Sequence, residues 1–202
     1  RAVIHLKCET VFSGGVGATG SVSIAGDKTV SRAALTCSSL NIESKEKRFS
    51  LKGVDGTIGF SELPSVRSDQ AQPFRFEKLE FGAVALSNGL VVLSIDGPGS
   101  FLVERAVCGI WGGKVSLAGL RVKGGGSDVE GIVACYGIEL APLLSALHWV
   151  GTEGTGELNG GLPFKMKGRD IAVERGYLQT MAGSGGTIRM RDTRFLKDCV
   201  PK

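Results

Sequence analysis

The sequence is poor in the residues that enzymes, metal sites and nucleic-acid-binding surfaces require. Among its 202 residues are two histidines, His5 and His148, and neither lies in a recognisable nucleophile or metal-ligand motif. The aromatic fraction is 6% and the net charge is only +4, too little for base stacking on a strongly basic surface. These shortages predict a protein that is not an enzyme, holds no metal or cofactor and binds no nucleic acid. The scattered acidic residues leave a paired-carboxylate site as the one catalytic alternative.

Long apolar runs are also missing. A membrane-spanning helix needs about 20 predominantly apolar residues, and the longest candidate, residues 140–150, is interrupted by Pro142, Ser145 and His148. The chain starts at Arg1 without a basic and apolar leader, so we expect a fragment or a processed chain whose targeting segment is missing. Its length suits a single domain over residues 1–202.

Cysteines are present but not in metal-binding patterns. The five are widely spaced, without a CxxC pair: Cys8, Cys37, Cys108, Cys135 and Cys199. An odd number leaves at least one thiol without a partner inside the chain. We expect small, buried apolar side chains, and one disulfide formed in an oxidising compartment is the alternative.

Glycine, by contrast, is abundant. The 31 glycines are about twice the usual share of ~7% and lack the Gly-X-Y period of collagen. Apolar residues alternate with polar ones in short stretches, such as residues 115–117, and glycine-containing turn signals separate these stretches. A period of two with frequent turns predicts an all-β fold, in which ten or more short strands form an antiparallel meander.

Local signals place some of the irregularities. Residues 52–56 contain Lys-Gly and Asp-Gly pairs, which predict a hairpin between strands at 49–51 and 58–60. The apolar residues change parity near residues 77–78, which predicts a bulge. Ser-Asn-Gly at residues 87–89 predicts a further turn, because Asn and Gly tolerate positive φ.

One segment has helical rather than strand periodicity. Four leucines follow at i, i+3, i+4 and i+7: Leu140, Leu143, Leu144 and Leu147. Pro142 is acceptable in a first helical turn and Gly151 is placed to end the helix. The pattern predicts a short amphipathic helix from Leu140 to Trp149. It is either an ordinary cap on a sheet or a lid over an apolar groove.

Several segments in the middle and C-terminal parts of the chain carry a family resemblance. They are residues 53–58 (GVDGTI), 72–82, 111–115 (WGGKV), 154–163 (GTGELNGGLP), 171–178 (IAVERGYL) and 185–189 (GGTIR). In this order, over about residues 41–192, they resemble the C-terminal region of YdbH-like proteins, bacterial envelope proteins similar to TamB and the AsmA-like group. Residues 1–40 match only as generic strands.

The resemblance implies a fold and a function. The fold would be a strongly curved antiparallel β-sheet, shaped like a taco, with an apolar groove on its concave side. The chain would be a C-terminal fragment of a periplasmic protein of a Gram-negative bacterium, anchored to the inner membrane by a segment outside this sequence. Its groove would carry acyl chains of phospholipids between the two membranes. Expected partners are a phospholipid or fatty-acyl ligand, other segments of the full-length bridge and an outer-membrane or envelope protein.

Two other functions remain open. The family is also labelled as acting in dicarboxylate transport, which would require converging Arg and Lys side chains in a polar pocket and a membrane span. A structural or protein-interaction module, whose sheet edge accepts a strand from a partner, is the other alternative.

The expected groove lining consists of apolar residues of like parity in successive strands, together with the helix. The candidates are Phe74, Phe76, Val91, Leu93, Ile95, Phe101, Val103, Val115, Leu117, Leu143, Leu144, Leu147, Trp149, Leu158, Leu162, Phe164, Ile171 and Val173. Three basic residues alternate with Phe164, Met166 and Gly168: Lys165, Lys167 and Arg169. They either meet phosphate headgroups at the groove mouth or form a solvated strand face.

Overall fold

The computed structural model describes residues 10–26, 28–44, 46, 48–63, 65–68, 71–82, 84–123, 129–149, 151–167, 170–181, 183 and 185–190. Within these ranges the elements are β1 (Thr10–Ala25), β2 (Lys28–Ser44), β3 (Phe49–Glu62), β4 (Arg67–Ser68), β5 (Gln72–Phe81), β6 (Val84–Gly97), β7 (Ser100–Ile110), β8 (Gly113–Val122), β9 (Val129–Glu139), α1 (Leu140–Ala146), β10 (Thr152–Thr155), β11 (Glu157–Lys167), β12 (Asp170–Val173), β13 (Tyr177–Thr180) and β14 (Thr187–Met190).

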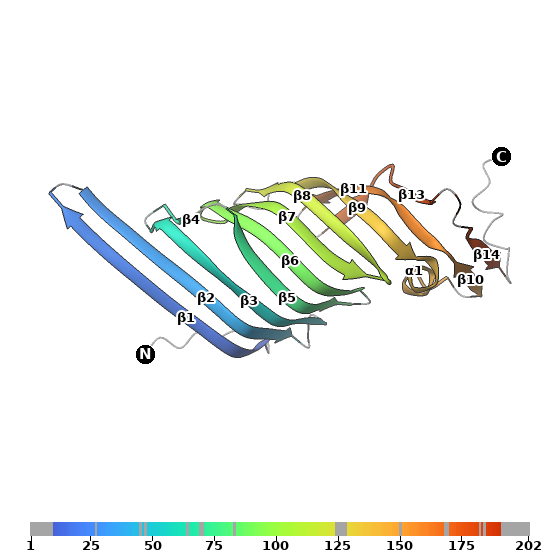
Figure 1. The fold of residues 1–202 in the computed structure, drawn as a ribbon, viewed down its shortest axis with the longest axis horizontal. Coiled ribbons are helices and arrows are strands. Elements are labelled where there is room, and N and C mark those ends of the chain that lie inside the picture. Colours follow the sequence, from blue (N-terminus) through green and yellow to red (C-terminus); the bar gives the residue numbers. More distant parts are fainter. Residues whose placement is uncertain are drawn as a thin grey trace.

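Most of the strands belong to one open antiparallel sheet. Its order is β1-β2-β3-β5-β6-β7-β8-β9-β11-β12, and β4 pairs with β3 while β13 pairs with β11, which makes twelve strands. β10 and β14 form a separate two-stranded sheet. The strands lie side by side nearly in chain order, with β1 at one end of the molecule and β14 near the other (Figure 1). The sheet is not closed into a barrel, and the predicted all-β, antiparallel architecture is confirmed.

Two of the predicted turns lie inside strands. β3 runs through residues 52–56 without a hairpin, and Gly53 is a left-handed residue within the strand, with φ of 63°. Asn88 likewise lies inside β6 with φ of 49°. The positive φ predicted for residues 87–89 is therefore present, but as a kink in a continuous strand rather than as a turn.

The predicted bulge is also displaced. β5 keeps one register with β3 and with β6 on both sides of residues 77–78. The shift in register lies between β6 and β7 instead, between Ser87 and Leu90, on either side of Asn88. The parity change in β5 therefore marks a real irregularity of the sheet. The corresponding shift in register lies in the neighbouring pair, between β6 and β7.

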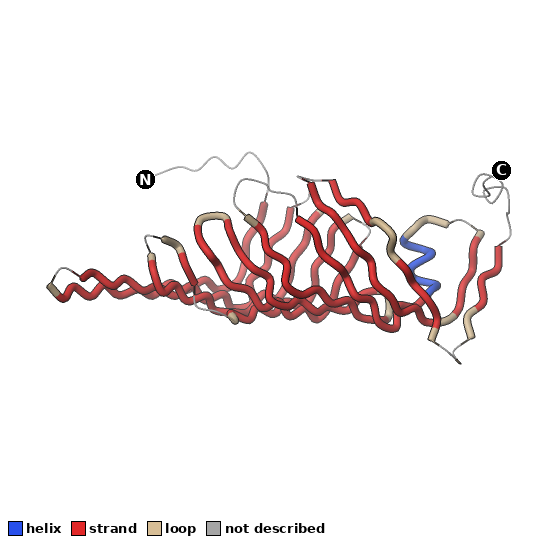
Figure 2. The backbone as a smooth tube through the Cα atoms, turned by 90° about the horizontal axis from the view of Figure 1, so that it is seen from above, coloured by secondary structure: helices blue, strands red, loops and turns tan. Residues whose placement is uncertain are grey.

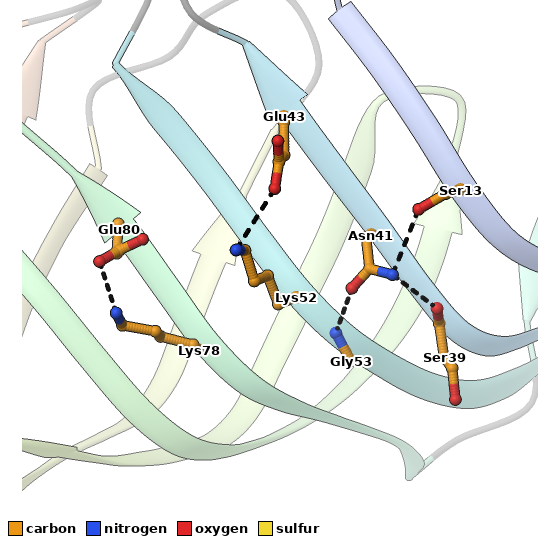
Figure 3. A network of polar contacts seen from close by, with 8 residues as sticks. All are labelled: Ser13, Ser39, Asn41, Glu43, Lys52, Gly53, Lys78 and Glu80. Carbon is orange, nitrogen blue, oxygen red and sulfur yellow. Dashed lines mark hydrogen bonds and ion pairs between the residues drawn. The ribbon is translucent and has the colours of Figure 1, made fainter.

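A polar network holds a similar irregularity in the first three strands. Gly14, Ser39 and Gly53 all have positive φ and lie at or beside shifts in register. The Asn41 side chain joins them, since its Oδ1 accepts the Gly53 N–H at 2.9 Å. Its Nδ2 donates to Ser13 Oγ at 3.3 Å and to the Ser39 carbonyl at 3.2 Å (Figure 3). One amide therefore connects three strands where the regular ladder is interrupted.

The predicted helix forms, but it is shorter than expected. α1 starts at Leu140, directly after β9, and has Pro142 in its first turn. It ends at Ala146 rather than Trp149, because Leu147 leaves helical geometry and His148 has φ of 54°. α1 lies between the large sheet and the β10–β14 pair (Figure 2). A small core of Ile110, Cys135 and Ile138 packs against Leu143 of the helix.

Candidate functional site

One face of the large sheet is apolar across most of its strands. In an antiparallel pair, residues directly opposite each other present their side chains on the same face. The register therefore defines a row of seven side chains from β1 to β8: Val16, Cys37, Gly56, Phe74, Val91, Ala106 and Leu117. None of the seven is charged. We call the surface that contains this row the apolar face.

A second row continues this face toward the C-terminus. It consists of Cys108, Val115, Cys135, Gly160 and Leu178, paired from β7 through β8, β9 and β11 to β13. Val115 and Leu117 lie two residues apart on β8, so both rows belong to one face. The apolar face thus extends from β1 to β13.

Several polar side chains of β2, β3 and β5 interact with one another. Thr36 and Thr57 share a hydrogen bond of 3.0 Å between their hydroxyls. Lys52 pairs with Glu43 at 3.4 Å and Lys78 pairs with Glu80 at 2.6 Å (Figure 3). The hydrogen bond from Lys78 lowers the pKa of Glu80. Thr36 and Thr57 are the sequence neighbours of Cys37 and Gly56 in the row, so alternation puts their hydroxyl pair on the face opposite the apolar face.

Glycine lets aromatic rings lie flat on the apolar face. The ring of Phe74 covers Gly56, where an added Cβ would lie 2.5 Å from Cδ1 of the ring. The ring of Phe164 covers Gly131 in the same way, with 2.8 Å from such a Cβ to Cε1. Leu120 also approaches Gly131, which places its side chain on the apolar face beside Phe164. Missing side chains at these glycines are thus replaced by rings from the neighbouring strand.

An apolar cavity lies at the C-terminal end of this face, where α1 meets the sheet. Its volume is about 350 Å³, within the usual range for ligand pockets. Its lining is Ile110, Trp111, Val115, Val133, Cys135, Ile138, Leu143, Leu162, Phe164, Val173 and Leu178. Every one of these described residues is apolar, whereas the cavity lined by Glu43, Arg48 and Lys52 has a mixed, charged wall. We call the first of these the α1 cavity.

The structure brings some of the predicted lining residues into the α1 cavity and places others elsewhere on the apolar face. Five line the cavity: Val115, Leu143, Leu162, Phe164 and Val173. Nine more lie on the apolar face by register or packing: Phe74, Phe76, Val91, Leu93, Ile95, Phe101, Val103, Leu117 and Leu158. Ile171 pairs with Met166 in the β11–β12 ladder.

The helix residues divide differently. Leu144 is buried against Gly154 of β10, away from the cavity. Leu147 and Trp149 follow the end of α1 and are 51% and 47% exposed. They were predicted to share the face of Leu143, and the early end of the helix is the reason that they do not line the cavity.

Six lining residues were not among the predicted ones: Ile110, Trp111, Val133, Cys135, Ile138 and Leu178. Val133 and Cys135 continue the alternation that starts at Val129, so the strand pattern contained that signal. Trp111 follows β7 with φ of 47°, a local geometry that periodicity does not reveal.

The thiols match the expectation of buried apolar side chains only in part, since Cys37 and Cys108 are half-buried. Cys37, Cys108 and Cys135 are free, and Cys135 is buried in the cavity wall. Burial raises the pKa of the Cys108 and Cys135 thiols, so both stay neutral at physiological pH. Cys8 and Cys199 lie outside the described residues.

Lys165 lies on a solvated strand surface. Its Nζ is 3.5 Å from Glu130 Oε1 and 3.7 Å from Glu174 Oε2. These two carboxylates, Glu130 foremost, raise the pKa of Lys165. Strand alternation puts Lys165 on the face opposite its neighbour Phe164. Its charge is therefore compensated away from the apolar face; Arg169 lies outside the described residues.

The described part of the chain offers little for other chemistries. Within it, no helix is long and apolar enough to cross a membrane. In the same residues, no group of three or more His, Cys, Asp or Glu side chains is arranged to hold a metal ion.

The fold and the site together define a β-sheet protein built around an open apolar surface. A family model described as "YdbH-like: Intermembrane phospholipid transport protein YdbH" matches residues 9–197. The chain belongs to this YdbH-like family, which is a family of lipid transport proteins rather than of enzymes. The match confirms the resemblance and starts well before residue 41, so the N-terminal strands belong to the family pattern as well. Neither the curated proteins nor the solved structures contain a match to the chain.

Proposed function

We propose that this chain is a segment of a periplasmic lipid bridge and that its apolar face holds the acyl chains of phospholipids during transport between membranes. The observation that carries the proposal is the uncharged row from Val16 to Leu117 across seven strands. Membership of an intermembrane phospholipid transport family supports it independently.

The energetics favour such a ligand. Burial of a methylene is worth about 0.8 kcal/mol, so a sixteen-carbon chain gains on the order of 10 kcal/mol before entropic costs are subtracted. This attraction has no preferred direction along the chain, so it holds a lipid without fixing its position. Free movement along the face is what transport requires.

The positive-φ residues would give the sheet the curvature of a groove. Positive-φ residues interrupt β1, β2, β3 and β6 beside shifts in register: Gly14, Ser39, Gly53 and Asn88. Bulges and glycines bend strands and increase their twist. A sheet bent toward its apolar face would shelter acyl chains and leave headgroups at the open side, in water.

The family also suggests where the protein works. An intermembrane transporter is associated with the cell envelope, and we place this chain in the periplasm of a Gram-negative bacterium, as one domain of a longer protein anchored in the inner membrane. Its partners there would be the remaining segments of the bridge and a protein of the outer membrane or envelope.

Native mass spectrometry of the purified protein, with lipid extraction from the same sample, tests the proposal. We expect phospholipid or fatty acid at a stoichiometric level. The double variant Leu93→Asp/Leu117→Asp should lose it, because both side chains lie on the apolar face. Ala118→Asp is the matched control, since its partner Arg105 and its neighbour Leu117 place it on the opposite face.

Circular dichroism would verify that both variants keep their strand content. Lipid that stays bound to the folded double variant would contradict the proposal. A lipid-free wild-type protein that also fails to take up a fluorescent fatty acid would contradict it as well.

A structural or interaction module is the second candidate, and β1 supports it. Among the described strands β1 pairs only with β2, and its sixteen residues include no charged side chain. Natural edge strands usually carry charges or proline that block further pairing. Light scattering tests this function. Self-association of the wild-type protein that is abolished in the variant Gly17→Lys would favour it. Dicarboxylate transport has less support, since Lys52 and Lys165 already pair with carboxylates.

A further inference from the structure

The α1 cavity is closed on one side by a firmly held helix. Leu143 of α1 packs against the core of Ile110, Cys135 and Ile138. The helix is fixed at its start, because the Glu139 N–H donates to the Trp111 carbonyl at 2.9 Å and the Leu140 N–H donates to the Gly156 carbonyl at 3.0 Å. The wall formed by α1 is therefore part of the folded structure rather than a loose flap.

Toward β8 the cavity is continuous with the apolar face. Val115 belongs both to the cavity lining and to the strand that carries Leu117 in the long uncharged row. A chain that lies along the apolar face can therefore enter the cavity from β8 and would meet α1 at its end.

The lining decides which end of a lipid can enter. None of the described lining residues offers a charged group or a side-chain amide or hydroxyl. A carboxylate or phosphate moved into such a cavity would lose its hydration and meet no cation. Among the described lining residues its side-chain donors would be the neutral Trp111 indole and the weak Cys135 thiol. An unpaired charge in such surroundings costs several kcal/mol at least. A terminal methyl and the methylenes beside it have no such cost and gain by burial. The nearest cation of β11, Lys165, lies on the opposite face and is paired with Glu130.

We propose that the α1 cavity is a seat for the methyl end of an acyl chain, and that α1 is the stop against which this end rests. The inference rests on the proposed function and deepens it, because it gives the bound chain a direction. The methyl end points toward α1, and the polar end lies toward the middle of the sheet. The seat fits a flexible alkyl chain with no polar group near its terminus.

The two tryptophans of the sequence allow a direct test. Trp111 lines the cavity, whereas Trp149 lies beyond the end of α1 and is not in the lining. In the Trp149→Phe variant the tryptophan fluorescence reports only on Trp111. Bromine quenches tryptophan on contact, so palmitic acids brominated beside the carboxylate, at mid-chain or beside the methyl would locate the chain. We expect quenching to increase toward the methyl and to be several-fold stronger there than beside the carboxylate.

The other results separate the two ideas. Binding of all three acids with equal quenching, or with the strongest quenching beside the carboxylate, would overturn the methyl seat and leave the lipid-holding face intact. Absence of binding, measured by displacement of a fluorescent fatty acid, would overturn both. The reciprocal variant Trp111→Phe, which keeps Trp149, is the control and should show a weak gradient or none.

Discussion

The amide N–H of Gly53 donates to Asn41 Oδ1 at 2.9 Å across β2 and β3, and this bond has a counterpart at the other end of the sheet. There the Gly137 N–H donates to Asn159 Oδ1 at 3.0 Å across β9 and β11. Both glycines have φ near 60°, and both bonds lie beside a shift in register. An asparagine opposite a left-handed glycine thus satisfies the backbone at two irregular points of this fold.

Asn41→Ala should destabilise the protein by about 1–3 kcal/mol, because the Gly53 N–H loses its partner and the bonds to Ser13 and Ser39 are lost too. Asn41→Asp keeps the acceptor for Gly53 and should lose less. Urea unfolding of both variants measures the difference. Equal losses would mean that the bond to Gly53 is not the important one.

Gly56→Ala should destabilise the protein by about 1–3 kcal/mol through overpacking, because its new methyl would overlap the ring of Phe74. Gly56 does not have a positive φ, so alanine fits the backbone conformation, and the strain comes from the contact between the methyl and the ring. Gly17→Ala on β1 is the matched control, since an added Cβ there meets nothing within 4 Å. Alanine in a strand is otherwise more favourable than glycine by about 0.5–1 kcal/mol. Thermal melts of the two variants should therefore shift in opposite directions.

The period of two was sufficient to predict the all-β class and the alternation that puts residues such as Phe74, Val91 and Leu117 in one row. It was not sufficient to separate a turn from a kink inside a strand. Gly53 and Asn88 carry the left-handed geometry that turn residues have, and the same residues serve in a bulge. What decides between the two is the partner strand, as with Asn41 opposite Gly53, and that partner lies beyond any local pattern.

The α1 cavity was predictable only in part, for a similar reason. Val115, Leu162 and Phe164 follow the alternation of their strands and were found from it. Trp111 directly follows β7 and is itself left-handed, and this backbone geometry brings its side chain into the lining. Leu147 does not line the cavity, because the helix ends at Ala146, three residues before the predicted end at Trp149. Both differences depend on how α1 packs, which periodicity does not encode.

The leucines of α1 give a prediction within one short helix. Leu144 is 3% exposed and packs on Gly154 and Leu140, so Leu144→Ala should cost about 2–5 kcal/mol by leaving a cavity. Leu147 is 51% exposed, and Leu147→Ala should change the free energy of unfolding by no more than about 0.5 kcal/mol. Chemical denaturation tests the contrast. Similar losses for both would show that Leu147 is buried by something else in solution.

Alkaline pH should destabilise the protein through the thiols of Cys108, which is half-buried, and Cys135, which is buried. Desolvation raises the pKa of Cys108 and of Cys135 in the folded state. The unfolded chain therefore releases these protons at lower pH than the folded chain does. The contribution to stability is complete below the ordinary thiol pKa, and it is lost as pH rises through that value toward the raised one. Cys108→Ala/Cys135→Ala lacks this term, so its free energy of unfolding should fall less steeply with pH than that of the wild type. Urea titrations under reducing conditions, from neutral to alkaline pH, compare the two slopes rather than the absolute stabilities, which the truncations also change. Parallel slopes would mean that these thiols do not titrate differently on folding.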